Sequence, residues 1–509
     1  MTKIVFSEQQ LKKIAINEKS DPIEFNEDTI RALFGHEAAE DENLIRLKAY
    51  YVKTDIYKSL KSQIPLFILV GHKGIGKSAL LNILHAEDKE SGNIPIIIQP
   101  DDIINLDISN TNFLQKIREW KDGIAGIILE KLILSINDSI SEKILSDISW
   151  INRFGSLVFS ILGKKLSDLQ KEHIKLNAAT FASLFKDSLF KERQVTVYLD
   201  DLDRGWKNST NDIDSLSAML NAIRDLSRNT YNLRFRVALR SDVYYAVRTS
   251  DETTDKIDSS VIWQRWSNHE ILVMLIKRIE TYFGRLVNEE FLLKSSQHEI
   301  QEYLHSVFEP RFCGHGHWDN APMYRVLMSL IRKRPRDLIK LCTLSARKAY
   351  INHHSCIKTN DLESIFNKYS NDRLTDTSNE YKSELPKIQE LLLKMKPSQK
   401  ELLQGRPCLF TRAQILEKLD NIISMSHFTF KDGKQATAHN LLTFLFKINF
   451  LTARKDDTSG IQRIYYDENQ YISSEFADFG FSFEIHPSYR WALQPGNIND
   501  LFKQIQLTD

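Results

Sequence analysis

The first half of the chain alternates between short apolar runs and longer stretches in which apolar residues recur every three or four positions. Runs of the first kind predict buried β-strands, and stretches of the second kind predict amphipathic helices. Five runs have the strand pattern: residues 65–70, 94–99, 195–199, 235–239 and, less clearly, 260–263. Since strands that alternate with helices form parallel sheets, this half predicts a parallel α/β sheet.

The same pattern divides the chain into further regions. Residues 1–60 predict a polar helical lead-in, and residues 61–268 hold the α/β core. Within the core, residues 111–191 have helical spacing and few turn signals, which predicts a helical insertion because the segment is too long for an ordinary connection. Residues 269–380 show helical stretches and no clear strand, which predicts a helical lid. The charged residues 370–380 predict either a domain boundary or a solvated helix face.

Residues 385–509 combine helices with short alternating stretches. Helical spacing covers residues 388–395, 412–419 and 438–448, and alternation covers 450–454, 461–466 and 481–486. Helices followed by short strands in this order are typical of a winged-helix domain.

The first apolar run leads into Gly71-His-Lys-Gly-Ile-Gly-Lys77-Ser78 and then into a helical stretch, which matches G-x-x-x-x-G-K-[ST] with its required flanks. Glycines let backbone N–H groups surround phosphates, Lys77 reaches the β and γ oxygens, and the Ser78 hydroxyl is a ligand of Mg²⁺. The motif predicts binding of ATP with Mg²⁺. The side chains of His72 and Lys73 are expected to be solvated. The predicted nucleotide-binding residues are Gly71, Lys73, Gly74, Ile75, Gly76, Lys77, Ser78 and Ala79.

A second motif follows the third apolar run, where adjacent carboxylates Asp200 and Asp201 come directly after Leu199. This position is the carboxyl edge of a parallel sheet, where a Walker B motif belongs. Asp200 is the predicted Mg²⁺ residue, and Asp201 is the predicted catalytic residue that orients the attacking water. The alternative is an acidic cluster that caps the next helix.

Two arginines are candidates to stabilise charge on the γ-phosphate. Arg240 ends the fourth apolar run and is the predicted sensor 1 residue. Arg336 lies in the first turn of a predicted helix after Pro335 and is the predicted sensor 2 residue, with Arg334 as the alternative. An arginine acting from a second subunit stays open among Arg204, Arg248 and Arg265.

Composition narrows the class of protein. Of the 509 residues, 42% are hydrophobic. The 68 Lys and Arg residues nearly balance the 67 Asp and Glu residues, so the chain has no large net positive charge that would attract nucleic acid or an anionic membrane. Four cysteines without a C-x-x-C pair suit a reducing compartment. With no signal-peptide pattern and no long apolar span, we expect a cytoplasmic protein without a membrane segment. A metal site at Cys313, His315 and His317 is not favoured, since the spacing is not that of a zinc finger.

The motifs taken together resemble those of a known group. Residues 37–41, the Gly71–Ser78 loop, residues 200–204, residues 334–337 and Ile485-His486-Pro487 are similar to bacterial P-loop ATPases near the STAND and KAP branches of the AAA+-like NTPases. The resemblance implies an ATP-driven switch of the kind found in antiphage defence, in which nucleotide state controls assembly or an effector. It implies an effector protein partner and a homo-oligomer or hetero-complex.

Other classes are less well supported. Residues 367–370 lack the aspartate of a GTPase N-K-x-D motif, and no ABC signature is present. A small-molecule kinase is usually a compact single domain, whereas more than 200 residues follow this core. Two alternatives stay open: an ATPase that acts on DNA through the winged helix, and a nucleotide-binding scaffold without turnover. DNA is not favoured, because the C-terminal region has no dense basic helix.

Overall fold

The computed structural model describes residues 23–37, 41–104, 106, 108, 112–141, 148–162, 177–187, 189–250, 255–403, 405, 407–457, 460–476, 478–494 and 498–507. The chain forms two compact units. One is Lys53–Arg265, called here the P-loop unit. The other combines Met1–Val52 with Trp266–Asp509 and is called here the C-terminal unit.

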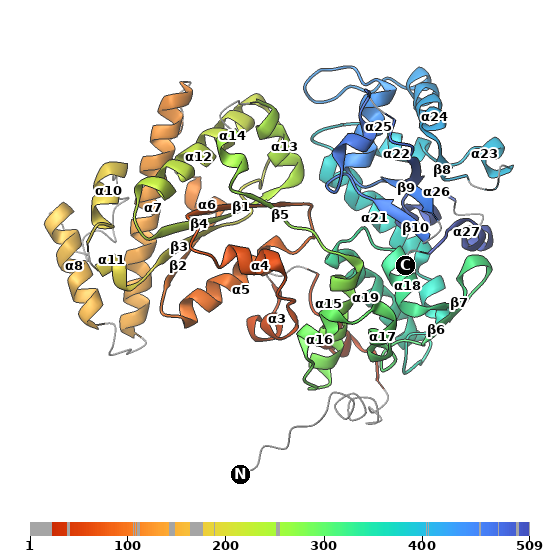
Figure 1. Ribbon diagram of the computed structural model, residues 1–509, viewed down its shortest axis with the longest axis horizontal. Coiled ribbons are helices and arrows are strands. Elements are labelled where there is room, and N and C mark those ends of the chain that lie inside the picture. Colours follow the sequence, from red (N-terminus) through yellow and green to blue (C-terminus); the bar gives the residue numbers. More distant parts are fainter. Residues whose placement is uncertain are drawn as a thin grey trace, which may run out of the picture. The chain divides into compact units, whose positions relative to one another are not determined.

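A five-stranded parallel sheet forms the centre of the P-loop unit (Figure 1). Its order is β2-β3-β4-β1-β5, so β4 lies between the strand that leads to the glycine loop and the strand that leads to the aspartates. This confirms the predicted parallel α/β core, including the least clear strand. The strands are β1 (Leu66–Gly71), β2 (Ile94–Ile98), β3 (Val195–Leu199), β4 (Leu233–Arg240) and β5 (Val261–Trp263).

Helices cover both faces of this sheet. Helix α5 (Lys77–Glu90) packs against β2, β3 and β4, and α12 (Thr210–Asn229) lies on the opposite face (Figure 1). Shorter helices complete the layers: α4 (Asp55–Leu60), α6 (Pro100–Ile103), α13 (Ser241–Ser250) and α14 (Asp255–Asp258).

The predicted insertion is helical wherever it is described. It holds α7 (Phe113–Ser141), α8 (Ile148–Leu162), α10 (Ala178–Leu184) and α11 (Leu189–Glu192). Helix α7 packs along α12, and Trp120, Ile124 and Ile128 are buried in the same hydrophobic core as the sheet. Because its apolar face completes that core, α7 is an integral layer of the unit.

The first part of the C-terminal unit is mainly helical. Helices α2 and α3 pack against α15, whose residues Ile271–Glu280 are all buried. Residues 1–22 of the predicted lead-in, and 38–40 of the upstream motif, lie outside the described residues. The helices are α2 (Glu27–Phe34), α3 (Leu44–Tyr50), α15 (Asn268–Tyr282), α16 (Glu289–Lys294), α17 (Gln297–Ile300), η4 (Gln301–Leu304), η5 (Gly316–Trp318), α18 (Met323–Ser329), α19 (Pro335–Ile351), α20 (Thr359–Glu363) and α21 (Phe366–Tyr381).

Two features of this part differ from the sequence pattern. A small antiparallel pair, β6 (Arg311–Cys313) and β7 (Asp319–Pro322), interrupts a region predicted to lack strands. These strands are very short and mostly exposed, so they leave no apolar alternation in the sequence. The charged residues 370–380 belong to the continuous helix α21, and Ser370, Arg373 and Thr377 on it are buried. They are therefore not a purely solvated face, and a domain boundary near their end stays a prediction.

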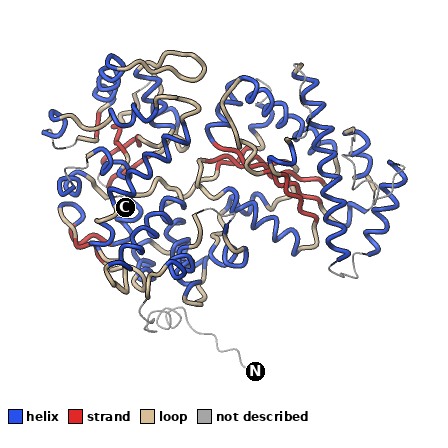
Figure 2. Tube along the Cα trace, turned by 180° about the vertical axis from the view of Figure 1, so that it is seen from behind, coloured by secondary structure: helices blue, strands red, loops and turns tan. Residues whose placement is uncertain are grey.

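The last part of the C-terminal unit contains the predicted helices and strands. A four-stranded antiparallel sheet has the order β10-β9-β11-β8, and in each unit helices flank the strands (Figure 2). The strands are β8 (Leu409–Phe410), β9 (Leu451–Asp457), β10 (Gly460–Ile464) and β11 (Ser482–Ile485). The helices are α22 (Ile388–Lys394), α23 (Gln399–Leu403), α24 (Arg412–Met425), α25 (Ala438–Lys447), η6 (Gln470–Ser473), η7 (Pro487–Tyr489), α26 (Arg490–Leu493) and α27 (Ile498–Gln504). No helix in the described part of the chain is long and apolar enough to cross a bilayer.

Candidate functional site

The glycine loop has the geometry that a phosphate loop requires. Strand β1 ends at Gly71 and α5 begins at Lys77, and Gly74 and Gly76 have φ of 81° and 96°. This left-handed conformation is easy for glycine and costly for other residues. Gly76 caps α5 without any side-chain hydrogen bond, so the first backbone N–H groups of this 14-residue helix have no capping side chain. Such a helix start attracts an anion.

Lys77 lies folded over the same loop. Its Nζ donates hydrogen bonds to the carbonyl oxygens of Gly71 at 2.8 Å and His72 at 3.2 Å. Ser78 is the next residue of α5 and is half-buried. The motif residues are thus gathered within a single turn of chain, as their spacing predicts.

His72 differs from the expectation. Its side chain is buried, and its ring nitrogen Nδ1 lies 3.2 Å from the Ser241 hydroxyl, which is also buried. The reason is tertiary: β1 and β4 are neighbours and end together, so the residue after β1 meets the first residue of α13. Lys73 is exposed, as predicted.

The aspartate pair follows β3, whose five residues are all buried. The Asp200 carboxylate accepts a hydrogen bond from the backbone N–H of Asp201 at 2.9 Å. Asp201 has φ of 57°, an uncommon conformation for a non-glycine residue and one often found at functional sites. Partial burial and the Asp200 carboxylate raise the pKa of Asp201, while Arg204, Lys73 and Arg240 oppose that rise. Asp201 therefore lies within electrostatic reach of the glycine loop and of Arg240.

Arg240 lies beside the loop and is held by two carboxylates. It is the register partner of Gly71 across the β1–β4 pair. Its Nε lies 3.1 Å from Oδ2 of Asp203, and its guanidinium donates two hydrogen bonds to Asp242, at 3.1 and 2.6 Å. Burial raises the pKa of Asp203, and the charges of Arg240 and Lys77 oppose this effect. Asp203 thus connects the predicted sensor electrostatically to the phosphate lysine.

Sequence reasoning gave no role to these two carboxylates. Asp203 follows the aspartate pair by two residues, and Asp242 follows Arg240 by two residues. The sequence thus places both carboxylates close to the ends of β3 and β4, and this closeness could have identified them.

Sequence reasoning also gave no role to Gln264. It follows β5 directly, its backbone oxygen would lie 3.2 Å from a Cβ built on Gly71, and its side chain is buried. Neither amide atom has a hydrogen-bond partner among the described residues.

The two lid arginines belong to the other unit. Arg334 is buried and forms an ion pair with Glu380 at 3.1 Å. Arg336 lies in the first turn of α19, half-buried, and its Nε donates to the Glu37 carbonyl at 3.2 Å. Of the pair, Arg336 is the more accessible, and its role as sensor 2 stays a prediction.

The remaining candidates have ordinary surroundings. Arg248 pairs with Asp258 at 3.1 Å, and the guanidinium of Arg265 lies 5.7 Å from the ring centre of Trp263. Arg204 is exposed. Within the described ranges, no group of three or more His, Cys, Asp or Glu is arranged to hold a metal ion. Trp266 and Trp318 are buried in the core.

The chain is similar to several known proteins. Residues 269–378 match the model of the FunZ-associated C-terminal helical domain, a range that runs from α15 into α21. A curated protein of Escherichia coli strain K12, the putative transposon gamma-delta 80.3 kDa protein, is 22% identical over 403 residues, which are 72% of this chain and 54% of that protein. The chain therefore spans about half the length of this curated relative.

Solved structures of ORC proteins also align with the chain. The Aeropyrum pernix ORC2 protein in ADPNP-ADP complexes aligns with a TM-score of 0.36 and 12% identity, over 96% of this chain and 97% of that one. Drosophila ORC bound to DNA aligns with a TM-score of 0.32 and 9% identity, over 97% and 98%. Both TM-scores are too low to transfer a function. The sheet order and the loop of the P-loop unit themselves have the form of an AAA+-like P-loop NTPase core.

Proposed function

We propose that this protein is an ATP-binding and ATP-hydrolysing molecular switch. The observation that carries the proposal is the convergence of three strand ends in one unit. The glycine loop after β1, the aspartates after β3 and Arg240 at the end of β4 meet at the carboxyl edge of one parallel sheet. This edge is where ligands bind in open α/β sheets.

The residues present fit ATP with Mg²⁺. The left-handed glycines and the uncapped start of α5 offer backbone donors to phosphate, and Lys77 adds a cation at the same place. Ser78 and Asp200 supply the oxygen ligands that Mg²⁺ prefers. When bound, the metal neutralises charge on the phosphate oxygens.

Three side chains of the P-loop unit would then have separate roles in hydrolysis. Lys77 would exchange its bonds to the loop carbonyls for phosphate oxygens. Asp201 would orient water and accept its proton, and its raised pKa suits that role better than an ordinary carboxylate. Arg240 would stabilise charge on the γ-phosphoryl group, with Asp203 and Asp242 holding the guanidinium in place.

The switch would act through other chains. By resemblance to the STAND and KAP branches, nucleotide state would control assembly or an effector protein in antiphage defence. An oligomer or hetero-complex would allow Arg204, Arg248 or Arg265 to act in a neighbouring subunit. Arg336 would report the nucleotide state from the lid.

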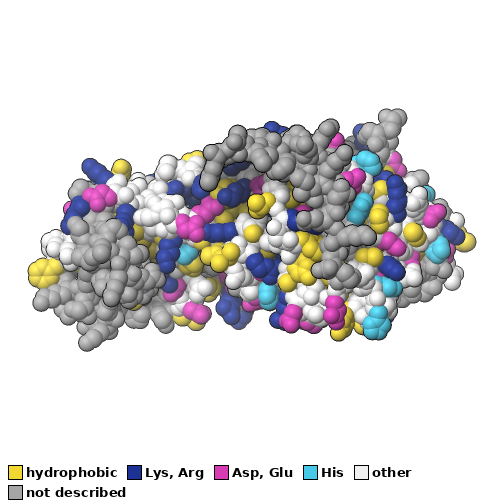
Figure 3. Space-filling model, turned by 90° about the horizontal axis from the view of Figure 1, so that it is seen from below, with side chains coloured by type: hydrophobic (Ala, Val, Ile, Leu, Met, Phe, Trp, Pro, Cys, Tyr) yellow, Lys and Arg dark blue, Asp and Glu magenta, His cyan; other side chains and the backbone are white. Residues whose placement is uncertain are grey.

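A DNA-acting ATPase is the second candidate, and the C-terminal helices and the β9–β10 hairpin are the elements that a winged helix would use. A groove of about 540 Å³ in this region is lined by four lysines: Lys394, Lys396, Lys400 and Lys418. Two of the four are ion-paired, Lys394 with Glu390 and Lys418 with Glu401. On the face drawn in Figure 3, basic and acidic side chains are interspersed. Since DNA affinity depends on phosphate neutralisation, the protein switch is favoured.

The test is Mg²⁺-dependent ATP turnover by the wild type, Asp201→Asn and Lys77→Ala, with and without duplex DNA. Lys89→Ala is the matched control, because Lys89 lies twelve positions further along α5, about 18 Å away at the rise of a helix. We expect Asp201→Asn to bind ATP with turnover reduced at least about 100-fold. Lys77→Ala should lose binding, and Lys89→Ala should match the wild type.

The outcomes separate the candidates. Turnover stimulated by DNA, with a steep loss at higher salt, would favour the DNA-acting ATPase. Binding of ATP without turnover in all chains would favour a nucleotide-bound scaffold. Undiminished turnover in Asp201→Asn would contradict the catalytic assignment.

A further inference from the structure

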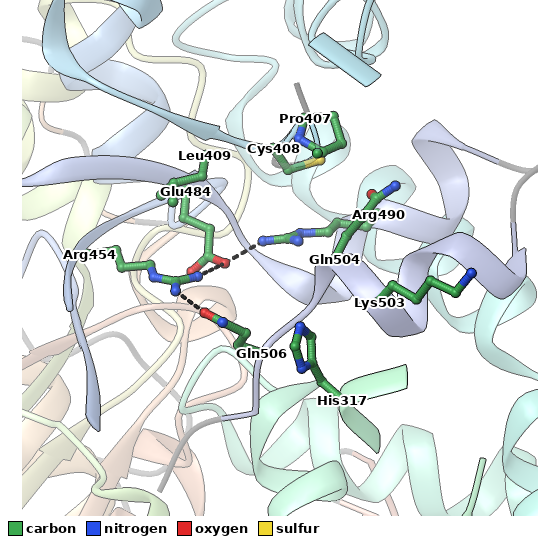
Figure 4. A pocket seen from close by; sticks show the side chains of 11 residues that line it. His317, Pro407, Cys408, Leu409, Arg454, Glu484, Arg490, Lys503, Gln504 and Gln506 are labelled. Atoms are coloured by element: carbon green, nitrogen blue, oxygen red, sulfur yellow. Dashed lines mark hydrogen bonds and ion pairs between the residues drawn. The ribbon is translucent and has the colours of Figure 1, made fainter. Parts of the chain in front are cut away.

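A pocket in the C-terminal unit lies outside the predicted nucleotide site. Its volume is about 210 Å³, and it brings together η5, β8, the β9–β11 pair, α26 and the end of α27. Figure 4 shows the guanidinium of Arg490 extending toward Glu484 and Arg454, with His317 and Lys503 away from the carboxylate. The lining residues are His317, Gly405, Pro407, Cys408, Leu409, Arg454, Glu484, Arg490, Lys503, Gln504 and Gln506.

Positive charge exceeds negative charge along this lining. Arg454, Arg490 and Lys503 are cations, and Glu484 is the one carboxylate among the lining residues. A third guanidinium, from Arg463, reaches the same carboxylate at 2.7 Å from behind the lining. Two further carboxylates lie at the margin, Asp456 against Arg454 and Asp500 at 3.9 Å from Lys503, and both are more than 40% exposed. Asp456 accepts two hydrogen bonds from Arg454, and solvent screens both Asp500 and Lys503, whose side chain is 71% exposed. The recessed excess is therefore that of three guanidinium groups, of Arg454, Arg463 and Arg490, over the single carboxylate of Glu484.

The buried arginines also have donors to spare. Arg490 donates from Nε to the Ile485 carbonyl at 2.9 Å and from Nη2 to Glu484. These bonds do not use its Nη1, which is not among the buried atoms that lack a partner in the described residues and so remains accessible. Arg463 donates to Glu484 and to the Gln506 carbonyl, and its buried Nη1 has no hydrogen-bond partner in the described part of the chain. A guanidinium carries five N–H donors, and a buried donor left unpaired is costly. At Arg490 the accessible Nη1 could donate to an acceptor-rich ligand in the pocket in place of water.

The lining points to binding rather than catalysis. Burial raises the pKa of the Cys408 thiol, so this cysteine stays protonated and is a poor nucleophile. Guanidinium and ammonium groups beside the glutamine amides of Gln504 and Gln506 match the oxygens of a phosphate group. The volume admits a small phosphorylated molecule and is below the range of drug-sized ligand sites.

From the excess of recessed cations, the spare donors of Arg490 and the size of the pocket, we propose that it binds a small phosphate-class anion, free or as a phosphate monoester. The ligand would contact Arg490 and Lys503 and would join η5 of the helical part to the last helix, α27. This proposal is independent of the nucleotide site.

The test measures binding of inorganic phosphate and glycerol phosphate by calorimetry to the full chain carrying Lys77→Ala, which removes the glycine loop as a phosphate site. Chloride at matched ionic strength is the reference, and acetate tests a carboxylate in place of phosphate. Lys503→Glu is the pocket variant, since Lys503 is 71% exposed and safe to change. Lys434→Glu is the matched control, because Lys434 is 82% exposed and does not line the pocket.

We expect phosphate or its ester to bind to the Lys77→Ala chain. The added Lys503→Glu should weaken this affinity at least about 10-fold, because it reverses a charge at the rim of the pocket. The added Lys434→Glu should leave the affinity unchanged. Tighter binding of glycerol phosphate would identify an organic monoester, and tighter binding of inorganic phosphate would identify the free ion. Heat no larger than with chloride, preference for acetate, or equal affinity in Lys503→Glu would each overturn the proposal.

Discussion

Two groups of arginine and aspartate side chains, one in each unit, use the same chemistry in different surroundings. In the P-loop unit, Arg240 lies between Asp203 and Asp242, and its side chain keeps 22% of its surface exposed. In the C-terminal unit, Asp337 lies between Arg332 and Arg373, and none of these three side chains is more than 2% exposed. We call the first the strand-end group and the second the buried group.

The buried group is fully committed to structure. Asp337 meets Arg332 at 2.7 and 3.0 Å and Arg373 at 2.6 Å, and Arg332 also donates to Thr377 and Tyr489. Burial alone would raise the pKa of Asp337, but the two guanidinium groups outweigh it and hold that pKa well below its usual range. The group ties α19 and α21 to η7, which identifies a clamp between the helical part and the sheet part of this unit.

The strand-end group has the opposite balance. Desolvation outweighs attraction at Asp203, whose pKa is raised, and solvent reaches the guanidinium of Arg240. An arginine in this position can exchange one partner for a phosphate oxygen at low cost. The difference teaches that an ion pair indicates function where its charges are incompletely compensated, and structure where they are fully enclosed.

The largest expected effect is at the buried group. Asp337→Asn leaves Arg332 and Arg373 buried without their carboxylate, and we expect the free energy of unfolding of the C-terminal unit to fall by about 3–5 kcal/mol. Denaturant unfolding measures this loss. Asp376→Asn is the control, because Asp376 is the 56% exposed outer partner of Arg373, and its removal should cost at most about 1 kcal/mol. Equal losses for both variants would contradict the distinction between enclosed and exposed partners.

Arg240→Ala should affect ATP turnover more than stability, in contrast to Asp337→Asn. We expect ATP turnover to fall about 100-fold, close to 2.7 kcal/mol of barrier, because a donor aimed at developing charge is lost. The stability of the P-loop unit should fall by less than in Asp337→Asn, by about 1–2 kcal/mol, because the guanidinium is partly solvated although its partners Asp203 and Asp242 are buried. Steady-state kinetics and unfolding of the same preparation check both halves. A stability loss as large as that of Asp337→Asn, with normal turnover, would make Arg240 structural.

The elements of this comparison differ in how far the sequence could predict them. The five strands were readable because each is a short apolar run, and the loop residues Gly71–Ser78 were readable because their spacing is local. The burial of His72, the pairing of Arg240 with Asp203 and the clamp around Asp337 join residues from different elements. Such contacts depend on which strand ends and helices lie side by side, and no local pattern encodes that. The polar composition of α21 suggested a domain boundary or a solvated helix face, because its buried polar side chains find their partners only in the folded chain.

Gln264 extends the comparison to an uncharged group. Its buried amide has no hydrogen-bond partner in the described part of the chain, which costs free energy without any charge. Gln264→Met keeps a similar shape, and we expect it to raise the free energy of unfolding of the P-loop unit by about 1 kcal/mol. Thermal and denaturant unfolding measure the change. A loss of stability would show that the amide has a partner and would remove this residue from the comparison.

The dependence of stability on pH separates the two groups most sharply. Asp203 has a raised pKa in the folded chain, so folding favours its protonated form, and its contribution to stability falls as pH rises from about 3.9 through the raised value. Asp337 has a lowered pKa, so its contribution is complete above about pH 4 and is lost as pH falls toward the folded value. The difference in stability between wild type and Asp203→Asn should therefore shift against the wild type with rising pH, by about 1.4 kcal/mol for each unit of pKa displacement. The free energy of unfolding of the wild type minus that of Asp337→Asn should increase as pH rises from 3 to about 4 and should stay constant above that. Denaturant unfolding of each pair between pH 3 and pH 7 gives the two slopes. If both slopes had the same sign, the two aspartates would share one kind of environment, and the contrast between a strand end open to phosphate and an enclosed clamp would fail.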